Sequence, residues 1–226
     1  MKHNIMIAKG VLVLALLPAC GSDNPVETPP ISGSDWPDPG KKESVMYYVQ
    51  RAYTERNSSR YIQILDEGFT NFLSDGDVNN GLPQQWDRQQ EVGITDNLFS
   101  KKQVPDPNNS GHFLPLVKSI EMDVQYENGV TWTEVNPSSA PTETWYQTTV
   151  FYFFQITVLP EGATEDLTYY PDINSKAQFT VRNAGTDSKP VWKLVEFHDL
   201  GSGTLARMLA ASTEQSTWGK VKSLYR

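Results

Sequence analysis

The sequence predicts an α+β domain with its helices first and an antiparallel sheet after them. Apolar residues recur at helical spacing in segments between residues 44 and 99, and from about residue 116 they alternate at every second position. Helices that precede a run of long strands are typical of the α+β class. A length of 226 residues, of which 38% are hydrophobic, is sufficient for one domain with a substantial core.

The first predicted helix begins at Ser44. Its apolar side chains are spaced as a helix packed against a core requires, at Val45, Tyr48, Val49 and Ala52. Asparagine and serine at residues 57–59 interrupt this pattern, and their side chains can cap a following helix.

A second short helix and a first strand are predicted next. The apolar side of the helix consists of Tyr61, Ile64 and Leu65. Gly68 is expected to end this helix, because glycine is a poor helix former. The strand that follows has Phe69, Asn71 and Leu73 on one face.

A third helix is predicted after a polar loop at residues 74–81. Pro83 suits the first position of a helix, where its missing N–H group is not needed. The helix then runs to Phe99, although Gly93 weakens it. Its apolar residues are Trp86, Ile94, Leu98 and Phe99.

The second half of the chain is predicted to form the sheet. The expected strands cover residues 116–126, 146–158, 177–181 and 191–197. The second of these has one continuous apolar face, and Phe151 and Phe153 lie on the other. It is therefore predicted to be a central strand that is covered on both faces. A turn is expected at residues 183–189.

This order of elements resembles the NTF2-like, or cystatin-like, cone, in which a curved antiparallel sheet wraps around N-terminal helices. The segments that carry the resemblance are 53–69, 86–99, 191–200 and 217–222. It covers residues 44–226, the last part as a C-terminal extension, and implies an open pocket inside the cone. The superfamily includes isomerases, dehydratases, ring-hydroxylase subunits, transport factors and binding modules, so the fold does not decide the function.

Residues 1–19 resemble the signal peptide of a bacterial lipoprotein. A basic start and an apolar run at residues 11–17 precede Leu-Pro-Ala-Cys, which ends at Cys20. The resemblance implies that the Cys20 thiol carries a diacylglycerol and that the protein is lipid-anchored in the bacterial cell envelope. It also implies the outer membrane in a Gram-negative cell, because Gly21 follows the cysteine. The alternative is an ordinary secretory signal with Cys20 as a spare thiol.

Residues 20–43 are predicted to be the lipidated cysteine and a flexible tether. The segment is rich in proline, serine, aspartate and glycine and poor in large apolar residues. Such a composition buries too little surface to offset the entropy of ordering. We expect the tether to hold the domain away from the membrane.

Charge and motifs exclude several classes of function. A net charge of −8 and a pI of about 4.9 disfavour a nucleic-acid partner. One cysteine excludes an intrachain disulfide and a cysteine-based metal cluster. The spacing of Asp75, Asp77 and Asn79 is that of a calcium loop, but Asn80 replaces the required glycine and Trp86 the closing glutamate. We therefore predict a polar turn there, and no cofactor or metal site.

Two groups of residues are candidates for a functional site. Glu196 and His198 share a strand face with Trp192, and inside a cone they could transfer a proton. The opposite face of that strand is equally apolar, so an outward position for both is the favoured interpretation. The remaining histidine of the domain, His112, lies in a polar loop and is expected to be exposed. Candidate ligand-binding aromatic residues, for which core packing is the alternative role, are Tyr48, Trp86 and Trp192.

Three functions are consistent with the sequence. The first is a membrane-anchored, non-enzymatic module that binds a small molecule or an envelope protein. The second is an isomerase, dehydratase or hydrolase that uses an acid or histidine in the cone. The third is a structural accessory subunit of an envelope complex. A titratable group deep in a closed pocket would favour the second function. An open cone filled by its own aromatic side chains, with an apolar patch outside, would favour the third.

Overall fold

The computed structural model describes residues 36–127, 129, 131–137, 142–169, 175–202 and 218–226. Its helices are α1 (Ser44–Glu55), α2 (Ser58–Ile64), α3 (Asp75–Asn79), α4 (Arg88–Phe99) and α5 (Trp218–Ser223). Its strands are β1 (Leu65–Phe72), β2 (Gln85–Asp87), β3 (Leu116–Tyr126), β4 (Thr133–Val135), β5 (Trp145–Leu159), β6 (Leu167–Tyr169), β7 (Ser175–Asn183) and β8 (Trp192–Ser202). No helix in these ranges is long and apolar enough to cross a membrane.

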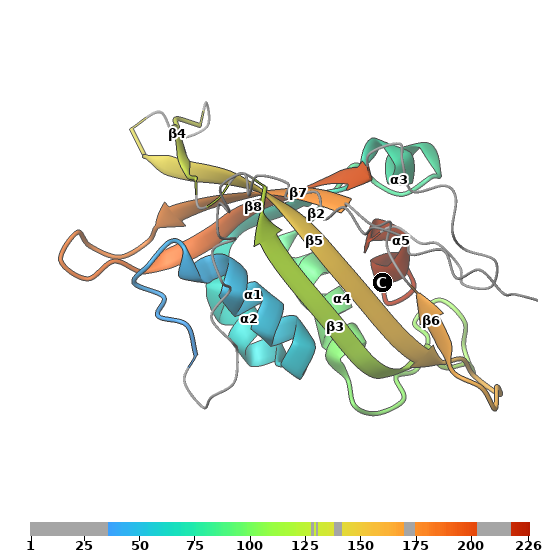
Figure 1. Ribbon diagram of the computed structural model, residues 1–226. Helices are drawn as coiled ribbons and strands as arrows, with labels where there is room; N and C mark the ends of the chain where they lie inside the picture. The colour runs from blue at the N-terminus through green and yellow to red at the C-terminus, as the bar shows by residue number, and fades with distance from the viewer. Residues whose placement is uncertain (1–35, 128, 130, 138–141, 170–174, 203–217) are drawn as a thin grey trace, which may run out of the picture.

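The strands form one strongly curved sheet in the order β2-β1-β8-β7-β5-β3, and β4 and β6 add to the two sides of β5. Every neighbouring pair is antiparallel except β1 and β8, which are parallel. Figure 1 shows the sheet bent around α1, α2 and α4, with α5 at the end of the molecule that α3 also occupies. The α+β class and the curved sheet around the N-terminal helices are therefore confirmed.

The first two helices form where the sequence predicts them. The apolar stripe of α1 is buried against the sheet, and Asn57 caps α2 by accepting a hydrogen bond from the backbone N–H of Arg60 at 3.1 Å. Arg56 ends α1 in a left-handed conformation with a φ of 54°. Its guanidinium donates to the carbonyl of Val117 at 3.0 Å, which fixes the end of α1 to β3.

The predicted start of the third helix was wrong. The helix begins at Arg88, five residues after Pro83, because Asp87 and Gln90 form a reciprocal capping box. The Asp87 carboxylate accepts from the Gln90 N–H at 2.8 Å, and the Gln90 side chain accepts from the Asp87 N–H at 3.1 Å. Trp86 therefore belongs to β2, where it pairs with Asn71, and not to the helix.

Two boundaries near β1 also differ from the prediction. Gly68 does not end a helix but lies within β1, which begins at Leu65 directly after α2. A register shift between Leu65 and Thr70 in the pairing with β8 accommodates it. The polar loop at residues 74–81 contains the short helix α3, which Ser74 caps through the N–H of Asp77.

The strand at residues 146–158 is central, but only one of its faces is covered. The face formed by Val150, Tyr152, Phe154, Ile156 and Val158 is buried. On the opposite face Phe153 is 38% exposed, so the prediction that both faces are covered was wrong. Among the residues that the structure describes, no second layer covers Phe151 and Phe153, which lie on the outer surface of the sheet.

A bulge in β8 divides its faces in a way that simple alternation does not predict. The pairing with β7 shifts between Thr180 and Val181, which leaves Val195 as an extra residue. Leu194 lies in the core before the bulge, and Phe197 lies in the core after it. Both alternatives for the faces of this strand are therefore only partly right.

Residues 36–43, which the sequence assigns to the tether, lie against the domain. The Trp36 ring packs on Tyr48 at a centroid distance of 4.8 Å, and the guanidinium of Arg51 lies 4.8 Å from its centre. The carbonyl of Pro39 accepts a hydrogen bond from the N–H of Trp192 at 2.8 Å. Packing within the described residues thus extends to Trp36.

Candidate functional site

The interior of the cone holds a fully buried ion pair between Glu91 of α4 and Lys222 of α5. Glu91 is 0% exposed and Lys222 is 1% exposed, and the ammonium donates directly to the carboxylate. Four further side chains donate to the carboxylate. They are the hydroxyls of Tyr61 at 2.7 Å, Tyr53 at 3.3 Å and Thr95 at 3.4 Å, and the amide of Asn71 at 3.1 Å. We call these six residues the inner cluster.

The charges of the inner cluster follow from these contacts. Burial alone would raise the pKa of Glu91, but the charge and hydrogen bond of Lys222, with Tyr61 and Asn71, outweigh it and hold the pKa below its usual value. Burial lowers the pKa of Lys222, and the attraction of Glu91 opposes this only in part. Burying both charges costs desolvation free energy, and their mutual attraction and hydrogen bonds offset that cost.

Helix α5 fills the space inside the cone with its own side chains. The Trp218 ring lies against Phe154 at 4.1 Å and against Tyr53 at 5.0 Å, between centroids. The Lys222 ammonium lies 4.6 Å from the centre of the Trp218 ring, a favourable cation–π arrangement. Helix α5 therefore covers one side of the buried Glu91 carboxylate through Lys222.

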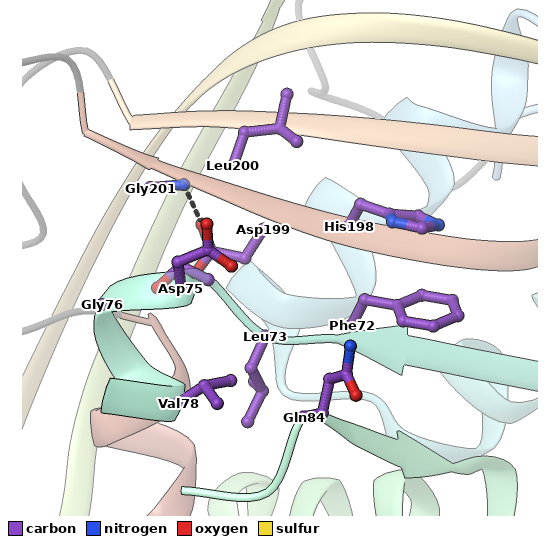
Figure 2. Close-up of a pocket in the computed structure, with 11 residues that line it drawn as sticks. Phe72, Leu73, Asp75, Gly76, Val78, Gln84, His198, Asp199, Leu200 and Gly201 are labelled. Carbon is purple, nitrogen blue, oxygen red and sulfur yellow. Dashed lines mark hydrogen bonds between the residues drawn. The ribbon is translucent and has the colours of Figure 1, made fainter. Parts of the chain in front are cut away.

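A hollow lies next to this filled interior, between α3 and the end of β8. We call it the α3 pocket; its volume is about 630 Å³. It is lined by Phe72, Leu73, Ser74, Asp75, Gly76, Val78, Gln84, His198, Asp199, Leu200 and Gly201. Figure 2 shows that these residues come from the end of β1, from α3, from the approach to β2 and from β8. The pocket is open, whereas the inner cluster is not.

Asp199 is the most unusual group in this lining. It is only 5% exposed, and its Oδ1 accepts from the Tyr152 hydroxyl at 3.1 Å and from the Gly201 N–H at 2.9 Å. Its other oxygen, Oδ2, is buried and has no hydrogen-bond partner within the described part of the chain. Burial, together with the nearby charge of Asp77, raises the pKa of Asp199 to about 6.

The two predicted catalytic candidates lie together on the outer face of the sheet. His198 Nε2 is 3.2 Å from Glu196 Oε2, and the imidazole stacks on the Phe72 ring at 4.1 Å with an interplanar angle of 19°. Both side chains are half-buried, and His198 also lines the α3 pocket. The hydrogen bond of His198 keeps the pKa of Glu196 below its usual value despite partial burial. Neither residue points into the cone.

The three aromatic candidates occupy different places. Trp86 is fully buried beside the inner cluster, 6.0 Å from the Lys222 ammonium, and its indole N–H has no partner in the described ranges. Tyr48 is buried under Trp36. Trp192 is half-buried and packs edge-on against Tyr146 at 5.5 Å. None of the three lines the α3 pocket.

Other predicted features have ordinary structural roles here. His112 lies on the surface, with Nδ1 2.9 Å from Glu161 Oε2. Asp75, Asp77 and Asn79 lie in the helical turn of α3, where Asp77 is buried and accepts from the Ser74 hydroxyl at 3.0 Å. Within the described residues, no group of three or more histidine, cysteine, aspartate or glutamate side chains could hold a metal ion. Cys20 lies outside those residues.

Sequence reasoning missed Glu91 and Asp199, but the chain carries a signal for each. Glu91 falls on the same helical stripe as Ile94, Thr95 and Leu98, so an acid occupies a core position of α4. Asp199 follows the bulge in β8, and only the bulge turns it inward. Lys222 lies in the C-terminal segment 217–222, where its burial is not evident from spacing.

The chain matches no protein-family model and no curated protein. Among solved structures it is similar to a conserved protein from Planctomyces limnophilus, with a TM-score of 0.43 and 11% identity over 70% of this chain and 90% of that one. For an NTF2-like superfamily protein from Salmonella enterica the TM-score is 0.42 and the sequence identity is 6%, over 74% of this chain and 92% of that one. For a cystatin-like domain of unknown function from Nostoc punctiforme the TM-score is 0.41 and the identity is 13%, over 74% of this chain and 84% of that one. At these values none of them informs the chemistry of this chain.

Proposed function

We propose that this protein is a lipid-anchored module of the bacterial cell envelope that binds a ligand without transforming it, and that the α3 pocket is its binding site. One observation carries the proposal. The inside of the cone is filled by α5 and the inner cluster, while the α3 pocket beside it stays open. The open hollow, and not the sealed interior, is therefore where another molecule would bind.

The inner cluster supports a structural role and not a catalytic one. An acid–base group must reach the proton that it transfers, but Glu91 is 0% exposed and its carboxylate already accepts from Lys222, Tyr61, Tyr53 and Asn71. Its lowered pKa also keeps it from acting as an acid near neutral pH. The aromatic filling of the cone fits the alternative of an accessory subunit equally well, whereas the open pocket favours ligand binding.

The lipid anchor rests on the signal-like residues 1–19 and Cys20. Two acyl signals or more are needed for stable anchoring, which a lipidated cysteine with an acylated amine would provide. The test is metabolic labelling with a radioactive fatty acid. We expect label on the wild-type protein and none on Cys20→Ala; equal label on both would contradict the anchor.

Binding without turnover is tested by a ligand screen on the full chain in detergent. The methyl groups of Leu73, Val78 and Leu200 line the α3 pocket and report binding there by NMR. We expect hits that shift these signals, spare the buried methyls of Ile94 and Ile156, and are recovered unchanged. The enzymatic alternative predicts instead that a hit is converted and that His198→Ala or Glu196→Gln stops the conversion, because His198 lines the pocket and is paired with Glu196. Such a result would overturn the proposal.

A further inference from the structure

The charge of the α3 pocket is one-sided. Its lining contains two carboxylates, Asp75 and Asp199, and neither lysine nor arginine is among the described residues that form it. The chain as a whole carries a net charge of −8, so the surrounding field has the same sign. An anionic ligand would be repelled, whereas a cation would be attracted.

The hydrogen bonding of Asp199 indicates what kind of cation fits. Its Oδ1 already has two donors, Tyr152 and Gly201, while the buried Oδ2 has none in the described ranges. Figure 2 shows this carboxylate next to Gly201 and the first turn of α3, among the residues that line the pocket. A buried carboxylate oxygen without a donor is costly, and a ligand that supplies an N–H relieves that cost. A primary ammonium group supplies three such donors.

The rest of the lining is suited to an apolar body. Leu73, Val78 and Leu200 contribute aliphatic surface, and Phe72 with His198 forms a stacked pair of rings at one side. A volume of about 630 Å³ lies within the range of small-molecule pockets. Metal ions are a poor match, since no set of three or more ligating side chains gathers in the part of the chain described.

We propose that the α3 pocket binds a small organic cation, a primary amine carried on an apolar or aromatic body, with its ammonium group directed to Asp199 and Asp75. This inference rests on the proposed function, because it names the ligand class of the same pocket. Binding requires an ionised Asp199, so affinity rises with pH through the region near 6, where its carboxyl loses its proton. The ionisable groups that act on this carboxyl are Asp77 of α3, Tyr152 of β5 and Lys222 of α5, and Asp75 and His198 line the same pocket.

The test compares three probes of similar shape on the full chain in detergent. They are 2-phenylethylamine, which is a cation, 2-phenylethanol, which is neutral, and 3-phenylpropionate, which is an anion. Affinity is measured by calorimetry, and the site is confirmed by the methyl signals of Leu73, Val78 and Leu200. We expect the amine to bind at least ten-fold more tightly than the alcohol at pH 7.5, and the anion not to bind.

Matched variants assign the preference to the pocket. Asp199→Asn keeps the shape and the acceptor oxygen for Tyr152 but removes the charge, so we expect at least a ten-fold loss of amine affinity and little change for the alcohol. Asp75→Asn is expected to lose a few-fold. Glu121→Gln removes the same charge from an exposed position of β3 and should leave affinity unchanged. His198→Gln removes the imidazole, and a pH dependence that persists in this variant but is lost in Asp199→Asn belongs to Asp199.

The outcomes separate this inference from the proposed function. Equal binding of alcohol and amine, or an Asp199→Asn protein that binds the amine like wild type, would overturn the amine assignment and leave the pocket as a binding site. The same holds if the anion binds best. If none of the three probes shifts the pocket methyls, the amine assignment fails, while the proposed function is judged by its own wider screen.

Discussion

Two buried carboxylates, only one of them fully paired, divide this molecule into a sealed region and an open one. Glu91 lies inside the cone, and each of its oxygens accepts a hydrogen bond from a neighbouring side chain. Asp199 lies at the edge of the same core, and one of its oxygens has no donor in the described part of the chain. The two residues are almost equally inaccessible to water.

The difference lies in pairing and not in burial. Lys222 and its neighbours outweigh the burial of Glu91 and lower its pKa, whereas burial of Asp199 raises its pKa to about 6. A paired acid is part of the structure, since removing its partner leaves an uncompensated charge. An acid whose oxygen has no donor beside an open pocket can gain a hydrogen bond when a ligand with an N–H group binds. Burial alone would not have distinguished the two roles.

The largest effect is expected from breaking the inner pair. Lys222→Met keeps much of the side-chain volume but leaves Glu91 buried without its cation. We expect a loss of about 3–5 kcal/mol of unfolding free energy at pH 7, measured by guanidinium denaturation. The loss should shrink toward pH 4, because protonating Glu91 removes the uncompensated charge.

The double variant Glu91→Gln/Lys222→Met is the control for this prediction. It removes both charges, and since each pays for desolvation we expect it to regain most of the lost stability. If Lys222→Met alone is as stable as wild type, the charge of Glu91 does not depend on Lys222 as described. The two regions would then no longer differ in how strongly the protein depends on the pairing of a buried acid.

The opposite sign is expected at Asp199. A carboxyl with a folded pKa of about 6 and an ordinary unfolded pKa near 3.8 binds more protons in the folded state between these values. Stability contributed by this group therefore falls as pH rises from about 4 to about 6 and stays low above that. Asp199→Asn should remove this slope and stabilise the protein at pH 7 by about 1–3 kcal/mol.

Glu91 provides the internal comparison for that pH profile. Its folded pKa lies below its unfolded value, so its contribution is present above the unfolded pKa and is lost as pH falls through the folded one. We measure the unfolding free energy of wild type and Asp199→Asn between pH 4 and pH 7.5. The two curves should converge at the acid end, where Asp199 is protonated in the wild type. An Asp199→Asn protein less stable than wild type at pH 7 would contradict the raised pKa of Asp199.

The same division explains what the sequence could predict. Several features follow from local spacing and form as expected. They are the α1 stripe, the cap at Asn57, the strands at residues 116–126 and 146–158, and the α+β class. Local signals failed where two of them competed. Pro83 suggested a helix start, but the capping box at Asp87 set the actual one.

The candidate site was less predictable because long-range pairing creates it. His198 and Glu196 were recognised from their spacing, and they do contact each other, but on the outer face. The inward turn of Asp199 depends on a bulge that arises from pairing with β7, and the burial of Lys222 depends on where α5 docks. Neither the inward turn of Asp199 nor the burial of Lys222 can be predicted from the alternation of residues along one strand. An acid on the apolar stripe of α4, Glu91, was the one clue available locally.

A smaller effect is expected where the two regions meet. Gly219 of α5 lies so close to α3 that an added Cβ would stand 2.5 Å from Asp77 Oδ2 and 3.0 Å from a Leu73 methyl. Gly219→Ala should therefore push α5 away from α3 and cost about 1–2 kcal/mol in chemical denaturation. Gly93→Ala, where an added Cβ meets nothing within 4 Å, is the matched control and should be neutral or slightly stabilising. Equal behaviour of the two variants would show that α3 and α5 are not in tight contact.

The smallest change in stability is expected at His198, which belongs to the open region alone. Its imidazole is half-buried, stacks on Phe72 and pairs with Glu196 in a partly solvated position, where such contacts are worth little. His198→Ala should lower the unfolding free energy by less than about 1 kcal/mol, but it removes one wall of the α3 pocket and should weaken 2-phenylethylamine binding a few-fold. Gln178→Ala changes the direct cross-strand neighbour of His198 outside the pocket and is the control. A His198→Ala protein that unfolds like Lys222→Met would place the histidine in the structural core, and the division between sealed and open regions would have to be drawn elsewhere.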